Sequence, residues 1–89
     1  MHEFRIYIVG GSNSSAKAMK AVENLEKLLK GEFRDKYILK IIDVLKNPQL
    51  IQEDSIFATP TIRRIYPLPN RTVIGDLSDG EKVLAILLS

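Results

Sequence analysis

Pro60 is the residue that most constrains how this chain can fold. It precedes residues 61–66, a run rich in β-branched and aromatic side chains that predicts a strand. Proline has no amide hydrogen to donate to a sheet, so within a sheet it must start a strand, lie on an edge or occupy a bulge. Pro60 fits the first of these places, and a Thr59–Pro60 bond is of the kind in which the cis form is accessible. We therefore expect a cis proline at the start of a strand.

The residues before Pro60 predict a strand, a helix and a second strand. Residues 3–9 alternate in polarity, as a strand with one apolar face does. Residues 16–30 carry apolar side chains at helical spacing, and we expect Gly31 to lie just beyond the helix C-terminus. Residues 37–44 are almost continuously hydrophobic, which predicts a strand buried on both faces and parallel to the first. A right-handed βαβ unit is the default connection. The expected buried face of the helix is Ala18, Val22, Leu25 and Leu29.

The residues after this unit predict a short helix, a hairpin and a final helix. Asn47 is expected to cap a helix that opens at Pro48. The strands at 61–66 and 71–75 flank a proline-rich loop and form a hairpin. The motif from Ser78 to Glu81 matches a capping box for the last helix. The order βαβαββα predicts one three-layer α/β domain over residues 1–89, with a mixed sheet and a thioredoxin-like fold.

The composition excludes several classes of function. The chain has 89 residues, no cysteine, a net charge of +2 and 45% hydrophobic residues. Without cysteine there is no disulfide, thiol catalysis or cysteine-ligated metal. Interspersed charges and few aromatic residues argue against nucleic-acid binding. No apolar run approaches the ~20 residues that span a bilayer, and no signal peptide is visible, so we expect a cytoplasmic protein with no membrane partner.

Polar residues in three places are candidates for chemistry, and a structural role is expected for each. Ser12 and Ser15 take the spacing of a thioredoxin dithiol, but we expect them to cap a helix; phosphate binding there is the alternative. His2 is the one histidine and lacks metal-ligand partners in the sequence. Asp76 and Asp79 are expected to cap a helix start rather than act as catalytic carboxylates. No catalytic residue, metal or cofactor is predicted.

Arg63 and Arg64 interrupt the alternation of the strand at 61–66. One of the two arginines must point toward a face that is otherwise apolar, unless the strand lies on an edge of the sheet. We interpret the pair as an indication of a partner surface.

Four segments resemble the KaiB family of circadian clock proteins. They are Ile-Asp-Val-Leu-Lys-Asn-Pro-Gln-Leu at 42–50, Ala-Thr-Pro-Thr at 58–61, Ile-Gly-Asp-Leu-Ser at 74–78 and Glu-Lys-Val-Leu at 81–84. The resemblance covers nearly the whole chain, and the first of these segments is its most specific part.

The resemblance implies a non-enzymatic binding protein. KaiB proteins bind the ATPase KaiC, and in the full oscillator they help to sequester KaiA and to displace a sensor histidine kinase. Lys17, Arg71 and Asp76 lie at positions where the family presents groups to its partners. We expect residues 37–44 to form a sheet edge, and an exposed edge can accept another strand. Ile38 and Lys40 are therefore candidates for contact with a KaiA-like strand.

The resemblance also implies two folds for one sequence. A monomeric thioredoxin-like form binds KaiC, and a tetrameric form of order βαββααβ has a rearranged C-terminal half. We accordingly expect a constant half, residues 1–55, and a half that can rearrange, residues 56–89. Cyanobacterial members have a glycine and an acidic residue where Ile86 and Leu88 stand here. Both replacements favour a terminal helix, and hence the thioredoxin-like form. The candidates for control of the fold are Pro60, Pro67, Pro69, Ile86 and Leu88.

Two other functions stay open at this point. One is a thioredoxin-fold enzyme or a cysteine-free binding module of that fold, although the missing cysteines remove the redox version. The other is a sensory or adaptor domain in KaiC-linked stress or kinase signalling, such as the sensory domain of a clock-linked histidine kinase. We expect the latter to carry a kinase region, which this sequence does not contain.

Overall fold

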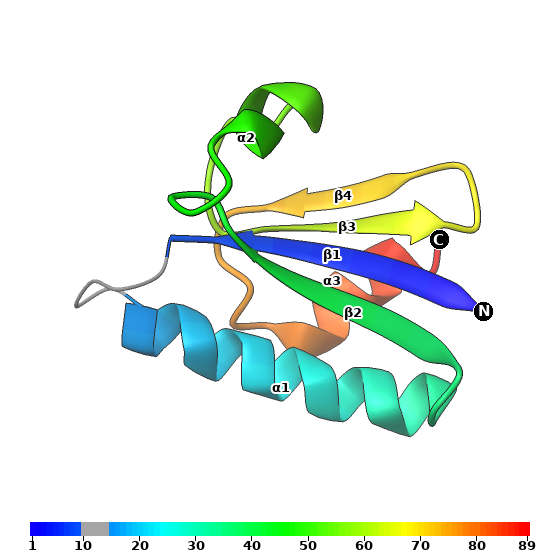
Figure 1. The fold of residues 1–89 in the computed structure, drawn as a ribbon. Helices are drawn as coiled ribbons and strands as arrows, with labels where there is room; N and C mark the ends of the chain where they lie inside the picture. The colour runs from blue at the N-terminus through cyan, green and yellow to red at the C-terminus, as the bar shows by residue number, and fades with distance from the viewer. Residues whose placement is uncertain (10–14) are drawn as a thin grey trace.

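The chain order of helices and strands is βαβαββα, as the sequence predicts. The computed structural model describes residues 1–9 and 15–89, without the side chains of residues 15, 17 and 18. The elements are β1 (His2–Ile8), α1 (Ser15–Phe33), β2 (Tyr37–Asp43), α2 (Gln49–Glu53), β3 (Thr61–Tyr66), β4 (Arg71–Ile74) and α3 (Gly80–Leu87). Figure 1 shows α1 and α3 on one side of the sheet and α2 on the other, so the expected three-layer arrangement is confirmed.

The described strands form a mixed four-stranded sheet of order β2-β1-β3-β4. β1 runs parallel to β2, as expected for a βαβ unit, and antiparallel to β3. β3 and β4 form the antiparallel hairpin. The order leaves β2 and β4 at the two edges, so one edge of each carries no neighbour among the described strands.

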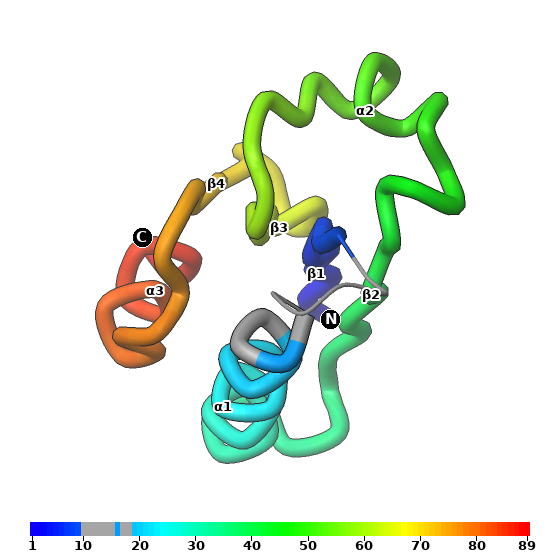
Figure 2. The backbone as a smooth tube through the Cα atoms, turned by 90° about the vertical axis from the view of Figure 1, so that its left-hand side faces the viewer, coloured from blue at the N-terminus to red at the C-terminus, as the bar shows by residue number. Residues whose placement is uncertain are grey.

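The main core lies between the sheet and the two longer helices. Phe4 and Ile6 of β1 and Ile62 of β3 point toward α1 and α3, which lie side by side in Figure 2. Fully burying a side chain of this size contributes about 1.5–3 kcal/mol to folding. The helix face predicted from sequence is confirmed where the structure describes it. The buried members of that face and of α3 are Val22, Leu25, Leu29, Val83 and Leu87.

A smaller cluster forms on the opposite face of the sheet. It consists of Tyr7, Val44 and Ile56, with Val9 and Ile42 packed against it. This cluster lies at the end of the sheet that α2 covers, and no other helix of the described residues lies on that face (Figure 1).

The prediction that residues 37–44 are buried on both faces is wrong. Ile38 and Ile41 of β2 are 42% and 44% exposed. β2 is an edge strand, and the helices cover the middle of the sheet more fully than its rim. The hydrophobic run therefore reflects strand propensity and partial burial rather than a central position.

The expected ends of three helices also differ from the structure. α1 continues past Gly31 to Phe33, because the Phe33 ring packs against Phe4 with centroids 5.7 Å apart. Arg34, at φ 56°, therefore takes the position just beyond the helix that was expected for Gly31. α2 begins after Pro48 rather than at it, and the Asn47 side chain donates to the Asp43 carbonyl rather than capping the helix.

The last helix is capped by the neighbour of the expected residue. Asp79 rather than Ser78 is the N-cap of α3, and its carboxylate accepts from the Lys82 amide at 3.2 Å. The Asp76 carboxylate accepts from the Ser78 amide, which orders the approach to the helix. Asp79 therefore caps the helix as predicted, whereas Asp76 holds the turn before it.

Candidate functional site

The predicted cis proline is confirmed at the start of β3. The Thr59–Pro60 bond is cis, and the Pro60 carbonyl accepts from the Gly75 amide at the end of β4. The Thr61 hydroxyl donates to the Ala58 carbonyl at 2.6 Å, which closes the turn before the strand. The Tyr66–Pro67 and Leu68–Pro69 bonds in the hairpin loop are also cis. The predictions for Ser12, and for the side chain of Ser15, fall outside the described residues.

An apolar groove lies beside this turn. Its volume is about 300 Å³. Leu45 and Phe57 project from it and are 65% and 87% exposed. The groove is lined by Val9, Val44, Leu45, Ile51, Ile56, Phe57, Ala58 and Thr59. None of these side chains ionises, so the groove can hold an apolar group but cannot perform acid–base chemistry.

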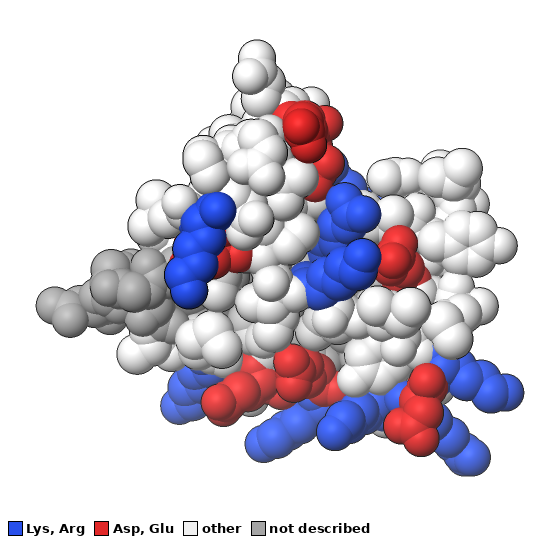
Figure 3. Space-filling view, in the orientation of Figure 1, with Lys and Arg blue, Asp and Glu red and all other residues white. Residues whose placement is uncertain are grey.

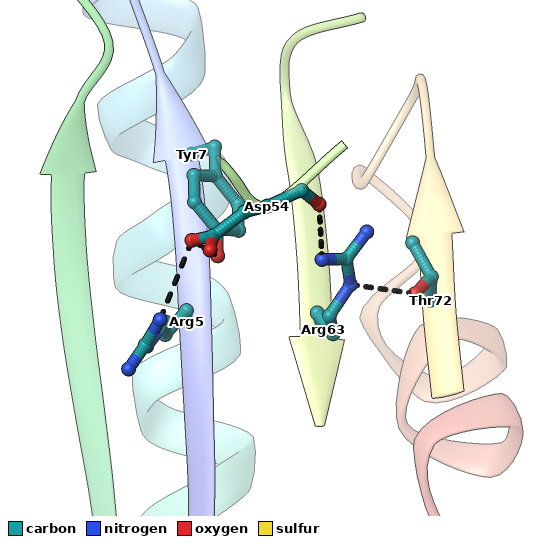
Figure 4. Close-up of polar contacts among 5 residues, drawn as sticks. All are labelled: Arg5, Tyr7, Asp54, Arg63 and Thr72. Carbon is teal, nitrogen blue, oxygen red and sulfur yellow. Dashed lines mark hydrogen bonds and ion pairs between the residues drawn. The ribbon is translucent and has the colours of Figure 1, made fainter. Parts of the chain in front are cut away.

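A polar network joins α2 to the open face of the sheet (Figure 4). The carboxylate of Asp54, the residue after α2, accepts from the Tyr7 hydroxyl at 2.6 Å and pairs with Arg5 at 3.3 Å. The Asp54 backbone carbonyl accepts from the Arg63 guanidinium, whose Nε also donates to the Thr72 hydroxyl at 3.0 Å. One residue thus ties β1 to β3 and, through Arg63, to β4.

Burial and charge shift the titration of two members of this network. Desolvation raises the pKa of Tyr7, and the hydrogen bond to Asp54 raises it further because the carboxylate favours the neutral phenol. The Tyr7 oxygen, followed by the Asp54 carboxylate, raises the pKa of Arg5. Both residues therefore keep their neutral-pH protonation states, which suits a structural clasp better than a proton-transfer site.

Three basic residues lie in one row across the open face. Arg5 of β1 is directly opposite Lys40 of β2 on one side and Arg63 of β3 on the other. Figure 3 shows lysine and arginine side chains gathered over the middle of this face. Like charges at opposed positions weaken a sheet, and among the described carboxylates Asp54 is the one that pairs with a member of the row. The row can therefore attract acidic groups.

The predicted partner-binding residues lie in three separate regions. Ile38 and Lys40 are exposed on the β2 edge, as expected. Arg71, at the start of β4, donates to the Ser89 hydroxyl at 3.3 Å and to the Asn70 carbonyl. Asp76 lies at the other end of β4, beside a hollow that Lys20 and Asn24 of α1 also line. Lys17 belongs to the first turn of α1, and its side chain is outside the described residues.

The candidates for control of the fold lie along the second half of the chain. Ile86 and Leu88 are half-exposed at the C-terminal end of α3, which confirms the expected terminal helix. Pro67 and Pro69 lie in the loop between β3 and β4.

Sequence reasoning missed the clasp around Asp54, because no local pattern links residues 5, 7, 54 and 63. The broken alternation did signal Arg64. This arginine is buried on the helix side of β3 and bonds to the end of α3, so its contacts are intramolecular rather than part of a partner surface.

The described residues provide no evident metal site. Among residues 1–9 and 15–89, no group of three or more His, Asp or Glu side chains is placed to hold a metal ion. The His2 ring packs against Phe33 with centroids 4.4 Å apart, and burial lowers its pKa. No helix in the same part of the chain is both long and apolar enough to cross a bilayer.

Solved structures with the same architecture identify the class of protein. The N-terminal domain of SasA from Synechococcus elongatus superposes with a TM-score of 0.69 at 20% identity, over 98% of this chain and 83% of that domain. The thioredoxin of Malassezia sympodialis gives a TM-score of 0.71 at 22% identity, over 98% and 72% of the two chains. The chain is therefore a thioredoxin-like domain, here without the cysteines of a redox site.

The sequence comparisons identify the family. A KaiB domain matches residues 5–88. The circadian clock oscillator protein KaiB of Synechococcus elongatus is 52% identical over 80 residues, which cover 90% of this chain and 76% of the relative. The chain belongs to the KaiB family.

Proposed function

We propose that this protein is a non-enzymatic clock protein that binds a KaiC-type ATPase hexamer and modulates its phosphorylation or signalling state through the thioredoxin-like form. The observation that carries the proposal is the 52% identity to circadian clock KaiB over 90% of the chain. The site agrees with this role, because its apolar groove and its basic row provide recognition groups without an acid–base or nucleophilic constellation. A reducing cytoplasm is the compartment we propose.

The β2 edge is the surface we propose for a second, KaiA-like partner. A strand added there would gain backbone hydrogen bonds along an unpaired edge, and its side chains would lie within about 4.5–5.5 Å of those of β2. Ile38 offers an apolar contact, and Lys40 offers a cation continuous with Arg5 and Arg63. Acidic side chains on the added strand would complement this row. Lys17, Arg71 and Asp76 are proposed as contacts with the KaiC-type partner.

We further propose that residues 1–55 form a constant half and that residues 56–89 can rearrange into the βαββααβ form. The thioredoxin-like form would be monomeric and the rearranged form tetrameric. Two folds separated by a few kcal/mol constitute a switch, because a partner that binds one form shifts the population toward it. Pro60, Pro67 and Pro69, together with Ile86 and Leu88, are the residues we propose to set the balance.

The direct test is to incubate the chain with a KaiC-type hexamer and ATP for up to a day and to follow co-elution of the two proteins by size-exclusion chromatography. Binding would move the 10.1 kDa chain into the hexamer peak. No co-migration after a day would contradict the proposal. For the β2 edge, Lys40→Glu should weaken capture by a KaiA-like protein about tenfold or more, whereas Lys27→Glu on the exposed surface of α1 should not. If Lys40→Glu and Lys27→Glu weaken capture equally, β2 is not part of the interface.

A second candidate is an adaptor domain for a KaiC-linked kinase or stress pathway. The architecture shared with the N-terminal domain of SasA favours it. If this candidate is right, the isolated chain should bind the hexamer and compete with a SasA-type domain, but it should leave the phosphorylation rhythm of a reconstituted oscillator unchanged.

A further inference from the structure

Arg64 is a charged residue in an apolar core. It follows Ile62 on the face of β3 that packs against the helices, and only 5% of it is exposed. Its guanidinium donates to the carbonyls of Leu87 at 2.7 Å, Pro69 at 2.7 Å and Ser89 at 3.5 Å. All of these acceptors are backbone oxygens, and its Nε has no partner among the described atoms. The side chain therefore joins β3 to the hairpin loop and to the end of α3.

Arg71 extends this contact. It is directly opposite Arg64 in the β3–β4 register, and its Nε donates to the Ser89 hydroxyl. Two cations at opposed positions repel each other. The C-terminal end of α3 offsets that repulsion, because the last carbonyls of a helix lack intrahelical donors and carry the negative end of its dipole. The hydrogen bonds from Arg64 to the Leu87 and Ser89 carbonyls, and from Arg71 to the Ser89 hydroxyl, place both arginines beside the C-terminal end of α3.

An ordinary packing role does not account for this arrangement. Burying an unpaired cation costs several kcal/mol, and an apolar side chain of similar size fills a core position without that cost. What the arginine adds is a requirement: its bonds form only when α3, the hairpin loop and β3 occupy these positions together. α3 has eight residues and would be marginal alone, so its docking depends on contacts of this kind.

We infer that Arg64 and Arg71 form a clamp on the C-terminal end of α3, and that this clamp determines whether α3 stays docked on the sheet. The inferred link to partner binding rests on the proposed function, because docking of α3 defines the thioredoxin-like form. The clamp itself does not depend on the proposed function. Loss of the clamp should release α3 and the hairpin loop while β1, β2 and α1 stay folded, since β1 keeps its pairing with β2 and Val22, Leu25 and Leu29 of α1 keep their place in the core with Phe4 and Ile6.

Amide hydrogen exchange on the full chain tests the clamp. In Arg64→Met, the amides of residues 83–88 should exchange about ten- to a hundredfold faster than in the wild type, while those of β1 and β2 keep their rates. Arg63→Met is the matched control, because Arg63 is the neighbouring arginine on the opposite face of the same strand; α3 exchange should not change in it. Arg64→Lys should be intermediate, because an ammonium cannot reproduce the guanidinium fork.

Two results would overturn the clamp. One is an unchanged exchange rate in α3 of Arg64→Met. The other is equal acceleration of all protected amides, which would make Arg64 a general core residue. If Arg64→Met fails to fold, Arg71→Met takes its place, and it should accelerate exchange in α3 by a few fold while β1 stays protected; no change in α3 would then refute the clamp.

Co-elution with the KaiC-type hexamer tests the link to function. Arg64→Met should co-elute less than the wild type, in proportion to the fraction of chains with α3 released. If Arg64→Met releases α3 but co-elutes as well as the wild type, the link between α3 docking and hexamer binding is overturned, while the clamp still stands. If the wild type itself does not co-elute, the proposed function fails, and the exchange result still decides the clamp.

Discussion

Tyr7→Phe removes one hydroxyl from the clasp that holds α2 on the sheet. That hydroxyl is buried and donates to the Asp54 carboxylate at 2.6 Å, a short distance even for an O–H donor to a charged acceptor. A hydrogen bond to a charged group contributes about 1.5–3 kcal/mol to stability. Water can replace part of it, because the Asp54 side chain is 18% exposed and keeps its ion pair with Arg5. We therefore expect a loss of about 1.5–2 kcal/mol.

Thermal and urea denaturation measure this loss. For a domain of this size, about 1 kcal/mol corresponds to roughly 4–8 °C in Tm, so Tyr7→Phe should melt about 6–16 °C lower at neutral pH. Tyr66→Phe is the matched control, since Tyr66 is 57% exposed and the same substitution there should cost less than about 0.5 kcal/mol.

A double-mutant cycle assigns the effect to the pair. Tyr7→Phe and Asp54→Ala should show a coupling free energy of about 1 kcal/mol or more when combined. Equal Tm shifts for Tyr7→Phe and Tyr66→Phe, or a coupling near zero, would refute the clasp.

Two further predictions follow from pKa and backbone geometry. Folding raises the pKa of Tyr7, so the unfolded chain releases the phenol proton at a lower pH than the folded chain, and the free energy of unfolding should fall as pH rises above about 10. Urea midpoints measured from pH 8 to 11 should fall less steeply in Tyr7→Phe than in the wild type. Parallel midpoint curves for the two proteins would contradict the assignment to Tyr7. Gly75→Ala should destabilise the fold by about 1–2 kcal/mol, because Gly75 has φ 100°. Gly31→Ala should stabilise it by up to about 1 kcal/mol, because this helical glycine has open space where a Cβ would lie. Urea midpoints that move in the same direction in the two variants would refute these predictions.

The elements of this fold could be predicted because their signals are local. Apolar spacing in α1 depends on the geometry of one helix, and Pro60 fits the position just before β3 because it lacks an amide hydrogen to donate to a neighbouring strand. Helix ends were less predictable. α1 passes Gly31 because Phe33 gains core contacts that outweigh the local preference for a stop, and such contacts exist only in the folded chain.

The candidate site was only partly predictable. The exposed positions of Ile38 and Lys40 were predictable, because the thioredoxin-like strand order places residues 37–44 at an edge of the sheet. The groove beside Phe57 and the basic row of Lys40, Arg5 and Arg63 were not found, since the groove forms only when residues 44–59 fold back beside Val9, and the row joins three separate strands.

The sequence by itself determined the order βαβαββα and the absence of thiol chemistry, because each depends on residue type or on neighbours within a few positions. Only the tertiary structure decided the roles of the charged residues. Asp54 became the link between α2 and three strands, and Arg64 turned inward to hold the end of α3. The physical reason is the same for both: the value of a charge depends on which acceptors and donors surround it after folding, and those partners come from segments that the sequence does not place side by side.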